Sequence, residues 1–286
     1  MSGASMNEIK ARMRSVKSTM QITRAMELVA TSKLRRVREG AEGAQAYYDA
    51  LERAVKPLLR GLSLEENGEW LSEGQGDEVL YIVVAGDRGL AGGYNSNIFK
   101  LARSSAAGES ATYLAIGKKA FDSLSHNGGN LLCGQRVAVS ELDGGDCYRL
   151  AQYICEQFAA GRFRRVELIY TQFVSILTQA PQRSVLLPLE LGGQDSDGQD
   201  APWGVVTDTP PERLAESVIP ELVCGKLYLA VRQSVAAETA ARRTAMNSAN
   251  KNAEEMINGL TLNYNRARQA VITQEITEIV SGADAL

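Results

Sequence analysis

The residues best placed for chemistry form a glycine-rich turn after a buried strand. The run EVLYIVV (78–84) is followed by AGDRGLAGGYN, which leads into a predicted helix. Such turns can bring a helix N-terminus against phosphate. The lysine and hydroxyl residue of a phosphate-binding loop are missing, as is G-x-G-x-x-G with its later acidic residue. We therefore interpret Gly86, Gly89, Gly92 and Gly93 as positions that permit positive φ and close packing.

No other group of residues predicts an independent active site or a bound cofactor. The acidic pair Asp143 and Asp146 lies in the turn DGGD and is expected to be solvated, and His126, the one histidine, lies in the turn SHNGGN. No activated nucleophile with a histidine base is indicated. The four cysteines share no C-x-x-C spacing, which leaves too few ligands for zinc. We expect them to be buried and reduced: Cys133, Cys147, Cys155 and Cys224.

The charge of the chain is unevenly distributed. The net charge is −3, but residues 1–62 hold 12 Lys/Arg against 6 Asp/Glu, whereas residues 63–212 hold 11 against 20. A localised basic excess indicates a partner surface. The sequence contains no secretory signal and no membrane-spanning apolar run. We therefore expect a cytoplasmic protein without direct membrane insertion.

Two long helices are predicted at the ends of the chain. Heptad steps from Ile9 to Leu62 meet apolar residues except at Thr23 and Glu27, which predicts a coiled-coil helix of about 80 Å. Pro57 predicts a kink or an early end. In the C-terminal arm, Pro210 and Pro211 indicate a helix start, and Pro220 suggests that the continuous part follows it. The second helix, over 221–282, would span about 93 Å, so one end should project beyond the first.

The C-terminal seam consists mainly of small residues, and a second stripe widens its apolar face. The seam positions are Val235, Thr239, Arg242, Met246, Ala249, Ala253, Met256, Leu260, Asn263, Ala267 and Ala270. The second stripe is Ile257, Tyr264 and Val271.

Between the arms, predicted strands alternate with helices. Strands are expected at 78–84, 111–117, 164–173 and 174–189, the last two as a hairpin, and a helix at 147–161. This alternation predicts an α/β fold, in which a Rossmann-like α/β domain is inserted into a long antiparallel two-helix coiled coil. The expected parts are an N-terminal shaft helix (1–65), an α/β globular domain (75–210) and a C-terminal shaft helix (211–286).

An antiparallel helix pair would bring both termini to one end and gather exposed basic and apolar residues there. Apolar residues off the main seam, Ile22, Met26 and Val29, indicate a binding surface. The partner should offer an apolar socket and acidic groups. Nucleic acid would supply only the charge. The basic residues are Arg12, Arg14, Lys17, Arg24, Lys33, Arg35, Arg36, Arg266 and Arg268.

The chain resembles the γ subunit of F-type ATP synthases. The similarity is carried by ITRAMELVATSKLRR (22–36), GDRGLAGGYN (86–95), AAETAARRTAMNSANKNAEEMI (236–257) and LTLNYNRARQAVITQEITEIVSGADAL (260–286). The resemblance implies a non-catalytic rotor shaft inside a hexamer of α and β subunits, in a proton- or sodium-translocating complex. It also implies contacts with the ε subunit and the membrane c ring, and a peripheral location on the cytoplasmic face of the bacterial inner membrane.

The same resemblance implies which residues bind partners. Residues in the first helix would face acidic loops of β, residues in the second would contact β loops, and the tip at 271–286 would sit in an apolar sleeve. In the usual form of the glycine turn, Cys and Leu occupy the places of Ala91 and Tyr94. The implied partner-binding residues are Met26, Lys33, Arg35, Arg36, Arg266, Arg268, Gln269, Thr273, Ile276 and Ile279.

Two alternatives remain at this stage. A coiled-coil scaffold or nucleic-acid-associated protein would self-associate through its seam or bind with strong salt dependence. A nucleotide-dependent enzyme would bind ATP by itself.

Overall fold

The computed structural model describes residues 6–60, 70–190 and 211–284. The chain divides into two compact units, one combining Met1–Ser32 with Arg242–Leu286 and the other comprising Lys33–Ala241. The two terminal helices each contribute to both units. The elements in chain order are α1 (Met6–Arg60), β1 (Glu78–Val84), α3 (Tyr94–Ser105), β2 (Ser110–Ile116), α4 (Lys118–His126), β3 (Asn130–Leu131), α5 (Gly144–Ala159), β4 (Phe163–Phe173), β5 (Gln179–Leu187) and α6 (Pro211–Asp284).

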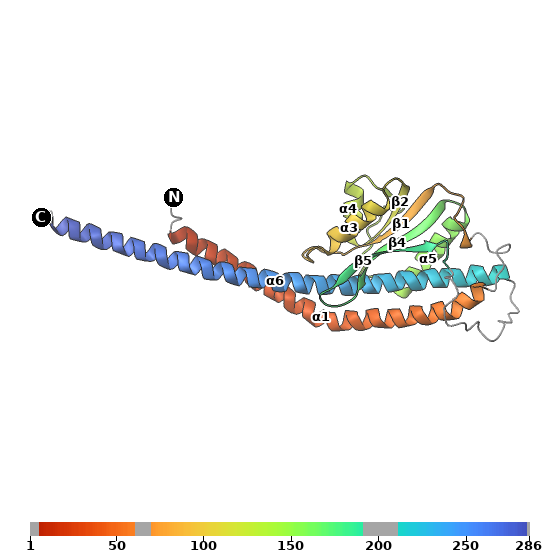
Figure 1. The fold of residues 1–286 in the computed structure, drawn as a ribbon, viewed down its shortest axis with the longest axis horizontal. Helices are drawn as coiled ribbons and strands as arrows, with labels where there is room; N and C mark the ends of the chain where they lie inside the picture. The colour runs from red at the N-terminus through yellow and green to blue at the C-terminus, as the bar shows by residue number, and fades with distance from the viewer. Residues whose placement is uncertain (1–5, 61–69, 191–210, 285–286) are drawn as a thin grey trace. The chain divides into compact units, whose positions relative to one another are not determined.

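The centre of the larger unit is a five-stranded sheet with the order β3-β2-β1-β4-β5 (Figure 1). Strands β1, β2, β3 and β4 pair in parallel, and β5 returns antiparallel to β4 as the predicted hairpin. The continuous apolar run 78–84 forms β1, which is buried on both faces as the central strand. The predicted α/β fold with two long helices is therefore confirmed. The two-residue strand β3 was not predicted, because it is too short to show a period.

The two faces of the sheet carry separate cores. On one face, Val79, Tyr81 and Val83 of β1 pack with residues of α3 and α4. On the other face, Leu80, Ile82 and Val84 belong to a larger core that includes α5 and parts of α1 and α6. Alternate residues of one strand thus serve opposite cores, as the pleat requires.

Within the larger unit, α6 is buried on nearly all sides. Leu227, Ala230, Ala236 and Ala240 have no exposed surface, because the sheet core lies on one side and α1 on the other. A Cβ atom added at Gly225 would lie 2.7 Å from Leu51 Cδ2 of α1, so a glycine here permits the close approach of the two helices.

In the smaller unit, α1 and α6 pack along the predicted seam. Ile9, Ala30, Met246 and Ala253 are buried there. Met256, however, was predicted in the seam and is 57% exposed. Because an α-helix has 3.6 residues per turn, a strict heptad drifts around it, and the neighbouring Ile257 is the less exposed residue here. The end of α6 extends past the start of α1, as the sequence predicted (Figure 1).

Several predicted boundaries need correction. Helix α6 begins at Pro211 and includes Pro220, so the continuous helix starts earlier than expected. Helix α1 passes Pro57 and ends at Arg60. The polar run GGQDSDGQDAPWG (192–204), which predicts a surface loop, lies outside the described residues.

The DGGD turn is the start of α5. The Asp143 carboxylate accepts a hydrogen bond from the backbone N–H of Asp146 (2.8 Å), and the Asp146 carboxylate accepts one from the Asp143 N–H (3.2 Å). These reciprocal bonds form a capping box, which satisfies two N–H groups at the helix terminus. The acidic pair therefore stabilises the start of α5, a role that the sequence DGGD did not predict.

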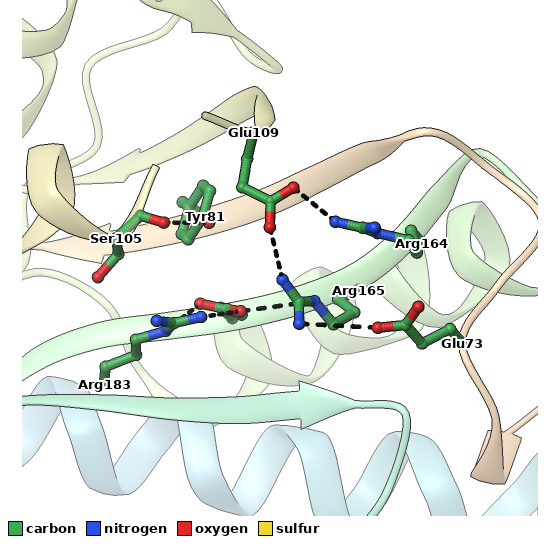
Figure 2. Close-up of polar contacts among 8 residues, drawn as sticks. Glu73, Tyr81, Ser105, Glu109, Arg164, Arg165 and Arg183 are labelled. Atoms are coloured by element: carbon green, nitrogen blue, oxygen red, sulfur yellow. Dashed lines mark hydrogen bonds and ion pairs between the residues drawn. The ribbon is translucent and has the colours of Figure 1, made fainter. Parts of the chain in front are cut away.

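A buried carboxylate on β4 was not predicted. Glu167 has no exposed surface and accepts two hydrogen bonds from Arg183 of β5, at 2.5 and 2.7 Å. Arg165 Nε lies 3.7 Å from Glu167 Oε1. The same guanidinium forms an ion pair with Glu109, with 3.0 Å between Arg165 Nη2 and Glu109 Oε1 (Figure 2). A buried charge needs such partners, and only strand pairing brings them together.

We predict that Gly117→Ala destabilises the larger unit. Gly117 precedes α4 with φ of 100°, and an added Cβ would lie 2.0 Å from the Ala85 carbonyl oxygen. Urea titration should show a loss of about 3 kcal/mol in the free energy of unfolding, the upper range for backbone strain.

The matched control is Gly134→Ala, since an added Cβ would meet nothing within 4 Å there. It should change the free energy of unfolding by less than about 0.5 kcal/mol. Equal losses in the two variants would contradict the strain interpretation.

Candidate partner interface on the helix pair

Exposed apolar side chains gather on the smaller unit. Among the described residues, ten of the fifteen exposed large hydrophobics belong to it. Such a concentration of exposed apolar surface marks a binding site. The ten exposed residues of the smaller unit are Ile22, Leu28, Val29, Met256, Leu262, Val271, Ile272, Ile276, Ile279 and Val280.

The N-terminal helix adds exposed cations to the smaller unit. Arg12, Arg14, Lys17 and Arg24 are all exposed on the part of α1 that belongs to the smaller unit. A surface of this composition suits a partner with apolar sockets and acidic groups.

The four predicted contact residues of α1 have different surroundings. Met26 is half-buried, whereas Lys33 and Arg36 are exposed. Arg35 pairs with Glu39 at 2.9 Å, with its own side chain 87% exposed. An exposed pair of this kind contributes about 0.5 kcal/mol or less, so a partner could replace it at little cost.

All six predicted contact residues of α6 are exposed. Arg266 and Arg268 lie on the last part of the helix next to Gln269. The Thr273 hydroxyl donates a hydrogen bond to the backbone carbonyl of Gln269 at 2.9 Å, so it is satisfied within the helix. Ile276 and Ile279, 56% and 72% exposed, lie on the projecting tip.

Three apolar residues of this surface were not predicted from the sequence. Leu28 and Leu262 are 65% and 61% exposed, and Met256 was assigned to the seam. Leu28 and Leu262 lie off the heptad positions, which was the signal that could have identified them. The sequence-predicted Ile22 and Val29 are exposed, at 60% and 55%.

The glycine turn after β1 has its polar groups engaged within the protein. The Asp87 carboxylate accepts hydrogen bonds from the backbone N–H groups of Lys118 (3.2 Å), Val139 (3.0 Å) and Ser140 (3.1 Å), and from the Ser140 hydroxyl (2.8 Å). Partial burial alone would raise the Asp87 pKa, but these hydrogen bonds outweigh it and hold the pKa below the usual 3.8. Asp87 therefore ties three segments together at the edge where α/β sheets bind ligands.

The same turn also contacts α6. The buried Tyr94 hydroxyl donates to the backbone carbonyl of Ser234 at 3.1 Å, and the Ser234 hydroxyl accepts from the Thr171 N–H at 3.3 Å. At Gly86, an added Cβ would lie 2.7 Å from the Glu238 carboxyl group. The turn and β4 together hold one stretch of α6 in place.

The predicted use of the four glycines is only partly right. Gly92 has positive φ (57°) and Gly86 packs closely, as expected. Gly93 has φ of −80° and precedes α3, and a Cβ at Gly89 would meet nothing within 4 Å. Leu90, a non-glycine residue, has the other positive φ of the turn (62°).

The cysteines and the histidine depart slightly from expectation. Cys147, Cys155 and Cys224 are buried thiols, but Cys133 is exposed. Burial raises the pKa of Cys155 to about 12, so this thiol is unreactive. His126 is the last residue of α4, and its Nδ1 lies 2.6 Å from the Asp122 carbonyl. Within the described ranges, no group of three or more His, Cys, Asp or Glu side chains could hold a metal ion.

Comparison with known proteins identifies the family. The sequence profile of the family described as "ATP synthase" matches residues 5–286. The ATP synthase gamma chain of Ruminococcus albus is 44% identical over 285 residues, covering 98% of both chains. This chain belongs to the ATP synthase gamma chain family. The gamma chain of Acetobacterium woodii described as sodium ion specific is 39% identical, again covering 98% of both chains.

Solved structures show the same fold. A chain of the Euglena gracilis mitochondrial ATP synthase has a TM-score of 0.63 at 17% identity, covering 98% of this chain and 94% of that one. A central stalk and c-ring structure from Tetrahymena thermophila contains a chain with a TM-score of 0.60 at 20% identity, covering 80% of this chain and 99% of that one. The family match and the gamma chain relatives confirm the resemblance stated from the sequence motifs.

We predict that Asp87→Asn lowers stability in a pH-dependent way. Because the folded-state pKa is depressed, the carboxylate stabilises the fold above pH 3.8 and loses this effect as the pH falls through its folded-state pKa. Urea titration at pH 7 should show a loss of about 2 kcal/mol, and the difference from the natural chain should shrink below pH 3.8.

The exposed carboxylate of the neighbouring segment, Glu141, provides the control. Glu141→Gln should leave the free energy of unfolding nearly unchanged at both pH values. A difference at Asp87 that is the same at pH 7 and pH 3 would rule out the carboxylate as its source.

Proposed function

We propose that the chain is the central-stalk rotor subunit of an F-type ATP synthase. In this role it couples ion-driven rotation of the membrane c ring to ATP synthesis or hydrolysis at the β subunits. The observation that carries the proposal is the family match over residues 5–286. The exposed apolar surface of the helix pair is consistent with it, since that surface would be covered by other subunits.

The proposed partners divide between the two units. A hexamer of α and β subunits would surround the smaller unit, with the α6 tip in an apolar sleeve and cations facing acidic loops. The ε subunit and the c ring would contact the α/β domain. This division is supported by composition, because exposed large hydrophobics are concentrated on the helix pair.

The mechanism we propose for this chain is mechanical. Catalysis would take place on β, and this chain would present different faces to three equivalent partners as it turns. Each β conformation must contact a different face if rotation is to change its affinity for nucleotide. Exposed Ile22, Leu28 and Val29 on α1, and Arg266 and Arg268 on α6, supply such an asymmetric surface.

The proposed location is peripheral, on the cytoplasmic face of the bacterial inner membrane. No helix in the described part of the chain has the length and apolar character of a membrane span. Attachment would then depend on the other subunits. The scaffold and nucleic-acid alternatives find no support among the relatives, which are named ATP synthase gamma chains.

The decisive experiment is co-purification. The tagged full-length chain, expressed at its natural level, should bring down α and β in stoichiometric amounts together with ε. Recovery of the chain alone, or with nucleic acid that is removed by salt, would overturn the proposed function.

We predict that Arg268→Glu impairs coupling. The new glutamate would face an acidic loop of β and repel it. A repulsion of about 1.4 kcal/mol changes the equilibrium of that contact about tenfold. ATP-driven ion pumping by the reconstituted complex should therefore fall several-fold while the chain remains assembled.

The control for this variant is Lys100→Glu, which makes the same charge change at an exposed residue of α3. It should retain ATP-driven pumping. Normal pumping by the Arg268 variant would remove this residue from the proposed contacts.

A further inference from the structure

A polar layer interrupts the apolar seam of the smaller unit. Thr23 and Glu27 occupy seam positions of α1, and Asn247 and Asn250 lie opposite them on α6. All four belong to the same compact unit. The layer therefore joins the two helices, and does not merely solubilise one face.

The hydrogen bonds of the layer fix each amide and the carboxylate. Asn247 Nδ2 donates to Glu27 Oε1 at 2.9 Å, and Asn250 Nδ2 donates to Glu27 Oε2 at 2.6 Å. The Thr23 hydroxyl donates to Asn250 Oδ1. One carboxylate thus receives two amides that lie one helical turn apart, and Thr23 holds one of these amides in the orientation that donates to Glu27.

The charge state of Glu27 suits this role. The Asn247 hydrogen bond is the main influence that lowers its pKa, with further contributions from Asn250, Arg243 and Arg24 that together outweigh desolvation. Both carboxylate oxygens are therefore acceptors at neutral pH.

The apolar seam alone specifies the axial register of the helices poorly. The buried hydrophobics among the described residues of this unit are Ile9, Ala30, Met246 and Ala253. Large and small apolar residues alternate along the α6 seam (Met246, Ala253, Leu260), and flexible methionine side chains fill irregular gaps, so a seam displaced by one heptad could still pack. Such a seam needs a polar contact to select one register.

A displaced register would lose the polar layer. One heptad toward the C-terminus, the residues at the places of Asn247 and Asn250 are Glu254 and Ile257. One heptad toward the N-terminus they are Ala240 and Arg243. The displacement toward the C-terminus would bring Glu254, a like charge, toward Glu27. The displacement toward the N-terminus would replace both amides and offer Glu27 the Arg243 guanidinium, so the polar layer would be lost in both registers but the like charge opposes only the first.

We propose that Glu27 is a positioning residue that sets the axial register of α1 against α6. The register fixes the height of Arg266, Arg268 and the α6 tip relative to Met26 on α1. In a shaft, contacts on the two helices must meet their partners at matching heights. This consequence for coupling rests on the proposed function, whereas the register itself does not.

The register can be measured on the full-length chain by pulsed electron paramagnetic resonance. Spin labels would be placed at exposed Lys10 of α1 and Lys251 of α6, which lie at different heights along the helix pair so that an axial displacement changes their distance, with Cys133 replaced by serine. The natural sequence should give one narrow distance distribution. Glu27→Leu should broaden it or add a second population, because a heptad displacement moves the helices by about 10 Å.

Thermal unfolding separates register from stability. Glu27→Leu adds an apolar residue to the seam, so its melting temperature should be maintained or raised while the distance distribution broadens. The matched control is Glu254→Leu, an exposed glutamate of α6 in the same unit. It should keep the narrow distribution.

A charge transposition tests the specific contact. Asn250→Asp alone places two carboxylates together and should broaden the distribution. The double variant Glu27→Gln with Asn250→Asp restores a donor and an acceptor, and should recover most of the narrow population. In the assembled complex, ATP-driven pumping should fall several-fold in Glu27→Leu. The double variant Glu27→Gln with Asn250→Asp should pump at close to the rate of the natural chain.

The outcomes are distinguishable. A single narrow distance in Glu27→Leu, identical to that of the natural chain, would overturn the proposal. So would the absence of recovery in the double variant. If the natural chain fails to assemble with α and β, the proposed function fails, but the distance measurement still tests the register.

Discussion

The packing of α1 against α6 is the interaction on which both units depend. In the larger unit, this packing completes the core below the sheet, and α6 is buried on nearly all sides. In the smaller unit, the same two helices pack against each other, and ten large hydrophobic side chains among its described residues are exposed. One helix pair therefore satisfies two different requirements along its length, an internal core and an external surface.

The glycine turn after β1 shows how a fold can remove an apparent ligand site. In open α/β sheets, the carboxyl ends of the strands are where ligands usually bind. Here Asp87 holds the backbone of the neighbouring segment, and Tyr94 reaches the backbone of α6 at 3.1 Å. The groups that could have met a ligand instead connect the sheet to the helix, so the turn is part of the mechanical framework.

Polar groups specify this structure where apolar packing is least selective. Glu167 and Arg183 meet across β4 and β5, and Glu27 meets two asparagines across the helix pair. Glu167 has no exposed surface and is costly to bury without its partner, whereas Glu27 is only partly buried. Both contacts join residues of two different elements, so each favours one pairing of those elements over alternatives that would separate the partners.

The sequence by itself determined the long helices, the α/β alternation and the family, because heptad periodicity and the terminal motifs are local patterns. It also placed Ile22 and Val29 off the seam, where the structure exposes them. It did not place Met256 correctly, because a heptad template drifts from a helix of 3.6 residues per turn. Only the tertiary structure decided that Asp143 and Asp146 cap α5, that Asp87 joins three segments, and that Thr23 and Glu27 form a polar layer with α6. The reason is physical: periodicity records which face of an element is buried, whereas the partners of a polar side chain depend on which distant residues folding brings within hydrogen-bonding distance.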